Sequence, residues 1–240
     1  MNTLCRQRMM VSIALAVAAT TGCAVEVGDG EVDSNRELIA VTEQPLSTAL
    51  GVDFSDYALG PLGSPWSVTR SGSGTSNVVS TTDHGRALRI AHSAERDYSL
   101  SQIALPPTAP ALQFDFAVKP RSSASTFTVT LKGPKSGYKI PKFALSLVPG
   151  SNALTVTSIG AGPSCGTLPY GRWSTVNGRL VDDGTGTGRR VMNVRVNGVL
   201  SACTGVTTSL RSANMLQVID NEQPSANAET LFDDFLVQSE

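Results

Sequence analysis

The sequence predicts an all-β protein, built as a sandwich of two antiparallel sheets. Short runs of alternating apolar and polar residues recur along residues 50–240, and no window of a dozen residues shows a helical period. Prolines fall between these runs, where a missing N–H costs no ladder hydrogen bond. The 19 Lys+Arg balance the 20 Asp+Glu, so the charge balance gives no indication of nucleic-acid binding.

The clearest predicted hairpin occupies residues 173–203. Its two arms, Val176 to Leu180 and Met192 to Val196, alternate apolar with polar side chains, and a glycine-rich polar loop joins them. Asn197-Gly198 then predicts a type I′ turn into a short third strand, because both residues accept a positive φ. Further strands are expected at residues 87–91, 98–105, 112–119, 127–131, 143–147, 154–156, 215–219 and 231–237.

Residues 1–22 are typical of a signal peptide, with a basic start and an apolar stretch at 11–19 that is too short to span a bilayer. Gly22-Cys23 resembles the lipobox of bacterial lipoproteins, in which the cysteine is acylated and becomes the mature N-terminus. Thr20 departs from the aliphatic residue usual in that motif. The alternative is an ordinary secretory peptide. The expectation is therefore an exported protein held by a lipid at Cys23 in the bacterial cell envelope, at the outer membrane or cell surface.

Residues 23–49 are expected to form a disordered acidic tether, and residues 50–240 a single folded domain. The tether has few large apolar groups and no sustained periodicity. Its acidic residues outnumber its one basic residue, Arg36. They are Glu26, Asp29, Glu31, Asp33, Glu37 and Glu43.

Four short motifs in residues 50–240 resemble a known family of β-sandwiches. They are V-D-F-S-D-Y-A-L-G-P-L-G-S-P-W-S-V at the start, then G-R-W, V-R-V-N-G and a closing F-D-D-F-L-V. Together they resemble the concanavalin-A-like, laminin-G-like jelly-roll family. The resemblance implies a jelly-roll topology, but a fold of this kind does not define a function.

Cys165 and Cys203 are the two cysteines that remain once Cys5 and Cys23 are set aside. In an exported chain, one remaining pair predicts one disulfide. A zinc site is the alternative, but two cysteines with no nearby histidine make a poor one.

The jelly-roll resemblance also implies a structural calcium ion, shared by an acid of the closing strand and an acid near the opening phenylalanine. Asp233 or Asp234 would supply the first, and Asp53 or Asp56 the second. Adjacent strand residues point to opposite faces, so only one of the closing pair is expected to serve. Ser55 stands where the family often has Glu, which removes a ligand. The alternative is that these charges protect a sheet edge from aggregation. No other cofactor is expected.

The sequence contains no arrangement of paired carboxylates typical of a glycoside hydrolase. His84 and His92 have no metal-ligand spacing and are interpreted as structural or solvated. Tyr138 and Tyr170 lie in predicted loops and are the candidates for stacking on a sugar ring. The leading hypothesis is a non-catalytic module that binds a glycan or polysaccharide. The alternatives are an envelope-structural or protein–protein interaction lipoprotein and, less favoured, a hydrolase or lyase.

Overall fold

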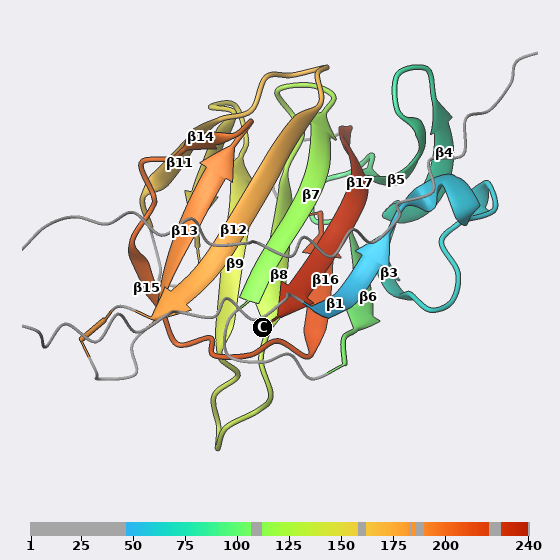
Figure 1. Cartoon of the computed structure of the whole chain (residues 1–240). Coiled ribbons are helices and arrows are strands. Elements are labelled where there is room, and N and C mark those ends of the chain that lie inside the picture. Colours follow the sequence, from blue (N-terminus) through green and yellow to red (C-terminus); the bar gives the residue numbers. More distant parts are fainter. Residues whose placement is uncertain are drawn as a thin grey trace, which may run out of the picture. The chain divides into compact units, whose positions relative to one another are not determined.

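The computed structural model describes residues 47–106, 112–157, 162–182, 184–185, 190–220 and 227–239, and two antiparallel sheets pack face to face within them (Figure 1). The predicted all-β jelly-roll sandwich is confirmed. The expected signal peptide and most of the expected tether lie outside the described residues. The first described strand, β1 (Ser47–Val52), starts just before the expected domain boundary at residue 50. No helix in this part of the chain is long and apolar enough to cross a bilayer.

The first sheet contains ten strands among the described residues. In spatial order, its main path is β14 (Val199–Leu200), β13 (Arg190–Val196), β12 (Ser174–Asp182), β7 (Leu112–Pro120), β17 (Ala228–Ser239), β5 (Gly85–His92), β4 (Thr75–Thr81) and β2 (Gly60–Pro61). Two further strands lie off this path: β1 pairs with β17, and β15 (Val206–Thr208) pairs with β13.

The second sheet has seven strands within the same ranges. Their spatial order is β11 (Ser164–Thr167), β10 (Ala153–Val156), β9 (Lys142–Val148), β8 (Phe127–Lys132), β16 (Met215–Ile219), β6 (Tyr98–Ala104) and β3 (Ser67–Ser71). Strands adjacent in sequence often lie in different sheets, as β7 and β8 do, so the chain crosses repeatedly from one layer to the other.

The core between the sheets is rich in phenylalanine. Phe235 stacks on Phe116 and Phe232 with ring centroids 5.9 Å apart, Phe116 and Phe232 are tilted at 6.4 Å, and Phe54 meets Phe235 edge-on at 6.2 Å. Phe54 belongs to a short 3-10 turn, η1 (Phe54–Asp56), which follows β1. Full burial of each ring contributes about 1.5–3 kcal/mol, so this cluster holds β7, β17 and the start of the domain together.

The predicted hairpin is confirmed. β12 and β13 pair in continuous register from Val176–Val196 to Asp182–Arg190, and β12 also pairs with β7. Asn197 and Gly198 have φ angles of 51° and 78°, as the predicted type I′ turn requires. Gly178 faces the core, where a Cβ would lie only 2.0 Å from the ring of Phe114. The glycine at this inward position is therefore explained by packing.

The predicted disulfide between Cys165 and Cys203 is also confirmed, with the two Cα atoms 4.7 Å apart. Cys165 lies in β11, at one edge of the second sheet, and Cys203 follows β14, at one edge of the first. Both cysteines are buried. The bond therefore joins the two layers along one side of the sandwich.

Candidate functional site

Six polar side chains form two rows across the outer face of β7, β12 and β13. We call this set the polar ladder: Gln113, Asp115, Asn177, Arg179, Asn193 and Arg195. Each strand turns alternate residues into the core, so the polar partners at these positions face away from it. The register places Asp115, Asn177 and Arg195 opposite one another, and Gln113, Arg179 and Asn193 likewise.

Hydrogen bonds orient the ladder around Asp115. Asn177 donates its side-chain N–H to Oδ1 of Asp115, and Gln113 Nε2 donates to Oδ2 at 3.2 Å. Arg195 donates to the carbonyl of Gly198 at 3.2 Å, which fixes the guanidinium beside the I′ turn. These four side chains are therefore positioned before any ligand arrives, which lowers the entropy cost of binding.

A hollow of about 460 Å³ lies over the ladder. Five of the six ladder residues line it, together with Leu200 and Thr204 of the neighbouring edge. Two guanidinium groups and three amides supply donors and acceptors suited to sugar hydroxyls and carboxylates. Asp115 is the single carboxylate of the ladder, and it lines a neighbouring hollow together with Asp53, Asp56 and Asp234. The ladder is thus built to hold a polar ligand.

A second cluster forms where β17 passes η1. His84 Nε2 lies 3.0 Å from Oδ2 of Asp234 and 3.5 Å from Oδ2 of Asp233, and the three side chains could hold a metal ion. The imidazole of His84 stacks on the indole of Trp173, with ring centroids 4.3 Å apart. Lys119 Nζ lies 5.9 Å from the centroid of the same indole. The cluster therefore combines a cationic side, an aromatic ring and two acids.

The structure places both acids of the closing pair in this cluster, so the expectation that they point to opposite faces is wrong at this position. The register of β17 against β7 shifts between Asp233 and Leu236, and Asp234 has a φ of 52°. This β-bulge breaks the alternation of faces, so both carboxylates reach His84. Asp233 is buried and accepts hydrogen bonds from the backbone N–H of Phe54 at 3.2 Å and of Asp234 at 2.9 Å. Burial raises the pKa of Asp233, in opposition to these bonds.

Asp53, the third expected calcium ligand, lies beside this cluster. Its carboxylate accepts from Ser55 N at 2.8 Å, which lowers its pKa, and it lines a shallow hollow together with Asp234. Asp53 therefore shares a hollow with Asp234, whereas the group of side chains close enough to hold a metal ion consists of His84, Asp233 and Asp234. The histidine is a nitrogen donor, which calcium does not favour, so His84 and calcium would compete for the same two acids. Calcium binding stays a prediction.

The two candidate tyrosines lie at opposite ends of the sandwich. Tyr138 is fully exposed on the connection between β8 and β9. Tyr170 adjoins Gly171, whose N–H donates to the carbonyl of Pro120 at the far end of β7, and its hydroxyl is buried with no hydrogen-bond partner among the described residues. Neither belongs to the polar ladder, and the two cannot contact one sugar.

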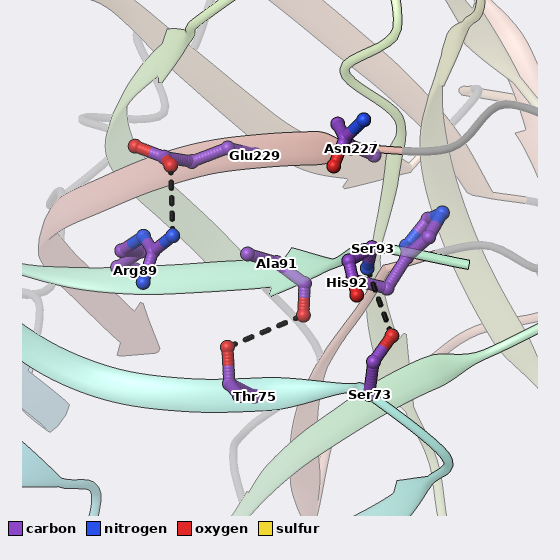
Figure 2. Close-up of a pocket in the computed structure, with 9 residues that line it drawn as sticks. Ser73, Thr75, Arg89, Ala91, His92, Ser93, Asn227 and Glu229 are labelled. Atoms are coloured by element: carbon purple, nitrogen blue, oxygen red, sulfur yellow. Dashed lines mark hydrogen bonds and ion pairs between the residues drawn. The ribbon is translucent and has the colours of Figure 1, made fainter.

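His92 and Asp220 form a buried pair between the sheets, Nδ1 of the imidazole to Oδ2 of the carboxylate. A small hollow of about 240 Å³ opens beside them, lined by residues of β4, β5 and β17 (Figure 2). Figure 2 shows Arg89 paired with Glu229 across this hollow, at 3.0 Å. Its charged groups are already paired, so the hollow is a weaker candidate for ligand binding than the one over the ladder.

Sequence reasoning missed the polar ladder and both histidine pairs. Asp115 alternates with apolar residues along its own strand, and its partners come from residues about 60 positions later. Only the order of strands and their register bring these residues together. The one signal available in the sequence was the alternation of apolar and polar side chains along β7 and β12, which marks the residues that face outward.

Comparison with known proteins identifies the fold without a family. No family model and no curated protein matches the chain by sequence. Among solved structures, a sialidase is similar with a TM-score of 0.60 and 12% identity over 81% of this chain, which spans 19% of the sialidase chain. A carbohydrate esterase from the Shiga toxin-encoding bacteriophage phi24B is similar with a TM-score of 0.57 and 16% identity. The match covers 81% of this chain and 99% of the esterase chain.

An endo-β-1,4-glucuronan lyase from the fungus Trichoderma reesei is also similar, with a TM-score of 0.55 and 13% identity over 76% of this chain and 94% of the lyase. At these identities the likeness establishes the jelly-roll fold. It does not transfer the activity of any of these proteins.

Proposed function

We propose that this protein binds a polysaccharide through the polar ladder, without cleaving it. The observation that carries the proposal is the pair of polar rows held in register across β7, β12 and β13, with a hollow above them. Guanidinium and amide groups in fixed positions suit the hydroxyls and carboxylates of a sugar chain. The glycan-related names among the structural neighbours support the same class of ligand.

The absence of catalysis is proposed from the composition of the ladder. Hydrolysis needs two carboxylates at the sugar, and a lyase needs a group that takes a proton from the sugar ring, whereas no carboxylate of the described residues lines the hollow over the ladder. Apart from Asp115, the polar ladder consists of two guanidinium and three amide side chains, which are poor proton acceptors at neutral pH. The second candidate is a lyase acting on uronic acids, which the two arginines favour because they would neutralise a carboxylate.

The first experiment is affinity electrophoresis of the chain through gels that contain neutral or uronic-acid polysaccharides. Binding by the parent is expected to weaken at least about tenfold in Arg179→Gln, because one charge-assisted hydrogen bond is lost. Arg172→Gln, at an exposed position outside the ladder, is the matched control. Retention unchanged by Arg179→Gln would contradict the proposal. Ultraviolet absorbance from an unsaturated product would instead identify a lyase.

We further propose that the chain is exported and anchored by acylation at Cys23. The Gly22-Cys23 pair and the apolar stretch at residues 11–19 support this, and the disulfide fits an oxidising compartment. Mass spectrometry of the mature N-terminus tests it, with Cys23→Ser as the control. An unmodified mature chain beginning elsewhere would leave a secreted protein. An envelope-structural or protein-binding role remains the alternative if no glycan is retained.

A further inference from the structure

Lysine is concentrated in one short segment of this chain. Only five lysines occur in 240 residues, and four of them lie between residues 132 and 142. This segment, Lys132–Lys142, contains no acidic residue, and we call it the basic hairpin. The chance scatter of a sparse residue does not produce such a cluster, so the segment calls for a physical explanation.

The basic hairpin is a rigid projection rather than a loose loop. Ser136 and Lys139 exchange backbone hydrogen bonds of 2.9 and 3.2 Å, and Gly133 N donates to the carbonyl of Pro141 at 2.8 Å. Gly137 has a φ of 58°, which suits the first central position of a tight hairpin turn. Tyr138, the other central residue, is therefore held fully exposed at the apex.

Within the described part of the chain, no opposite charge compensates the basic hairpin. Lys132 and Lys142 lie directly opposite each other in the β8–β9 register, where like charges destabilise a sheet. Burial and the neighbouring Lys142 both lower the pKa of Lys132. Among the described residues, no carboxylate forms an ion pair with any lysine of the hairpin or with Arg211 nearby. An anion bound beside these lysines would relieve their mutual repulsion.

A hollow of about 730 Å³ lies between the basic hairpin and residues 209–212. Three cations, Lys139, Lys142 and Arg211, line it together with the hydroxyl-bearing residues Ser136, Ser209 and Ser212. Cationic groups and hydroxyls in this combination suit the oxygens of a phosphate. Ile140, half-exposed, and Tyr138 extend the surface with apolar and aromatic groups.

The basic hairpin also lies at the end of the sandwich where the N-terminal chain enters. Ser47 pairs with Ser239, and Ser239 pairs with Leu112 at the start of β7. β7 ends at Pro120 and β8 begins at Phe127, so the end of β8 returns to the end where β7 began. Figure 1 shows the connection between β8 and β9 projecting beyond the sheets at the end where the C-terminus is marked. Ser47, where the described chain begins, and the basic hairpin thus lie at the same end of the sandwich.

We propose that the basic hairpin docks the domain onto the anionic surface of a lipid bilayer, with phosphate headgroups in the hollow and Tyr138 at the interface. Charge complementarity, the exposed aromatic apex and the shared end with the N-terminal chain favour a membrane over a soluble polyanion. Lysines near an anionic leaflet each strengthen binding several-fold, and tyrosine prefers the headgroup region. The proposal is independent of the polar ladder, which lies on the outer face of the other sheet.

The test is co-sedimentation of the full chain carrying Cys23→Ser, which has no acyl chain, with phosphatidylcholine vesicles that contain or lack phosphatidylglycerol. The parent is expected to bind vesicles that contain phosphatidylglycerol more tightly than vesicles that lack it. In Lys135→Gln/Lys139→Gln, the affinity for the anionic vesicles is expected to fall roughly 20-fold. Arg96→Gln/Arg172→Gln removes the same amount of charge from exposed positions elsewhere, and this variant is expected to keep the parent's tighter binding to anionic vesicles. Thermal unfolding by circular dichroism checks that both variants are folded.

Fluorescence locates the contact. In Tyr138→Trp, the new indole is expected to show a blue-shifted emission with anionic vesicles only. The proposal would be overturned if the parent showed no preference for anionic vesicles. It would also be overturned if the two double variants lost the same affinity for anionic vesicles, because net charge alone would then explain the attraction. The proposal would also be overturned if the chain bound no vesicles but bound soluble polygalacturonate through its lysines. That result would assign the basic hairpin to an anionic glycan.

Discussion

Asp220 shows how one buried carboxyl sets the pH dependence of this fold. Burial raises its pKa to about 6 from an ordinary value of 3.8, against the lowering effect of His92, and its Oδ1 has no hydrogen-bond partner among the described residues. Between those two pH values the folded chain holds a proton that the unfolded chain releases. This carboxyl therefore stabilises the fold at low pH, and that contribution is lost as the pH rises through about 6.

We expect Asp220→Asn to remove this dependence. The shift corresponds to about 3 kcal/mol, so the variant should gain up to that much free energy of unfolding relative to the parent between pH 4 and pH 7. Urea unfolding of both proteins across this range measures the difference. A difference that stays constant from pH 4 to pH 7 would show that Asp220 ionises in the folded chain as it does in the unfolded chain.

At the scale of the element, the β-bulge of β17 decides whether a cation can bind. We expect calcium to raise the Tm of His84→Ala more than that of the parent, because removal of the imidazole frees Asp233 and Asp234. Asp53→Asn in the same background should reduce the shift if Asp53 is a ligand. Differential scanning calorimetry with calcium or a chelator measures it. If calcium left the Tm of every variant unchanged, the prediction of a calcium site would be contradicted, and the cluster would be an ion pair without a metal.

The elements themselves were largely predictable from sequence, because period-two alternation encodes which face of a strand is buried. β7, β8, β12 and β13 follow the predicted alternation, and Asn197-Gly198 specifies its turn locally. The bulge at Asp234 was not predictable, since a non-glycine residue at positive φ leaves no mark in the pattern. The polar ladder was not predictable either, because its members meet only through a register that no local signal contains.

For the whole molecule, the disulfide is the one covalent cross-link, beyond the backbone itself, that joins the two sheets in the described part of the chain. It closes a loop with a sequence separation of 38, which corresponds to about 4 kcal/mol in the chain-entropy account. We expect Cys165→Ser/Cys203→Ser to lower the free energy of unfolding by about that amount, measured by urea denaturation. Reduction of the parent with dithiothreitol should give the same loss. A loss well under 1 kcal/mol would mean that packing alone closes this edge.

The position of Trp173 has an optical consequence. The chain has two tryptophans, and Trp66 is buried against Phe54 and Phe235, whereas the indole of Trp173 lies against the imidazole of His84. In a Trp66→Phe background, Trp173 would be the single indole of the chain, so its emission would report on its contact with His84 and on changes at the two acids beside that imidazole. The fold thus contains its own fluorescent indicator, readable without any label.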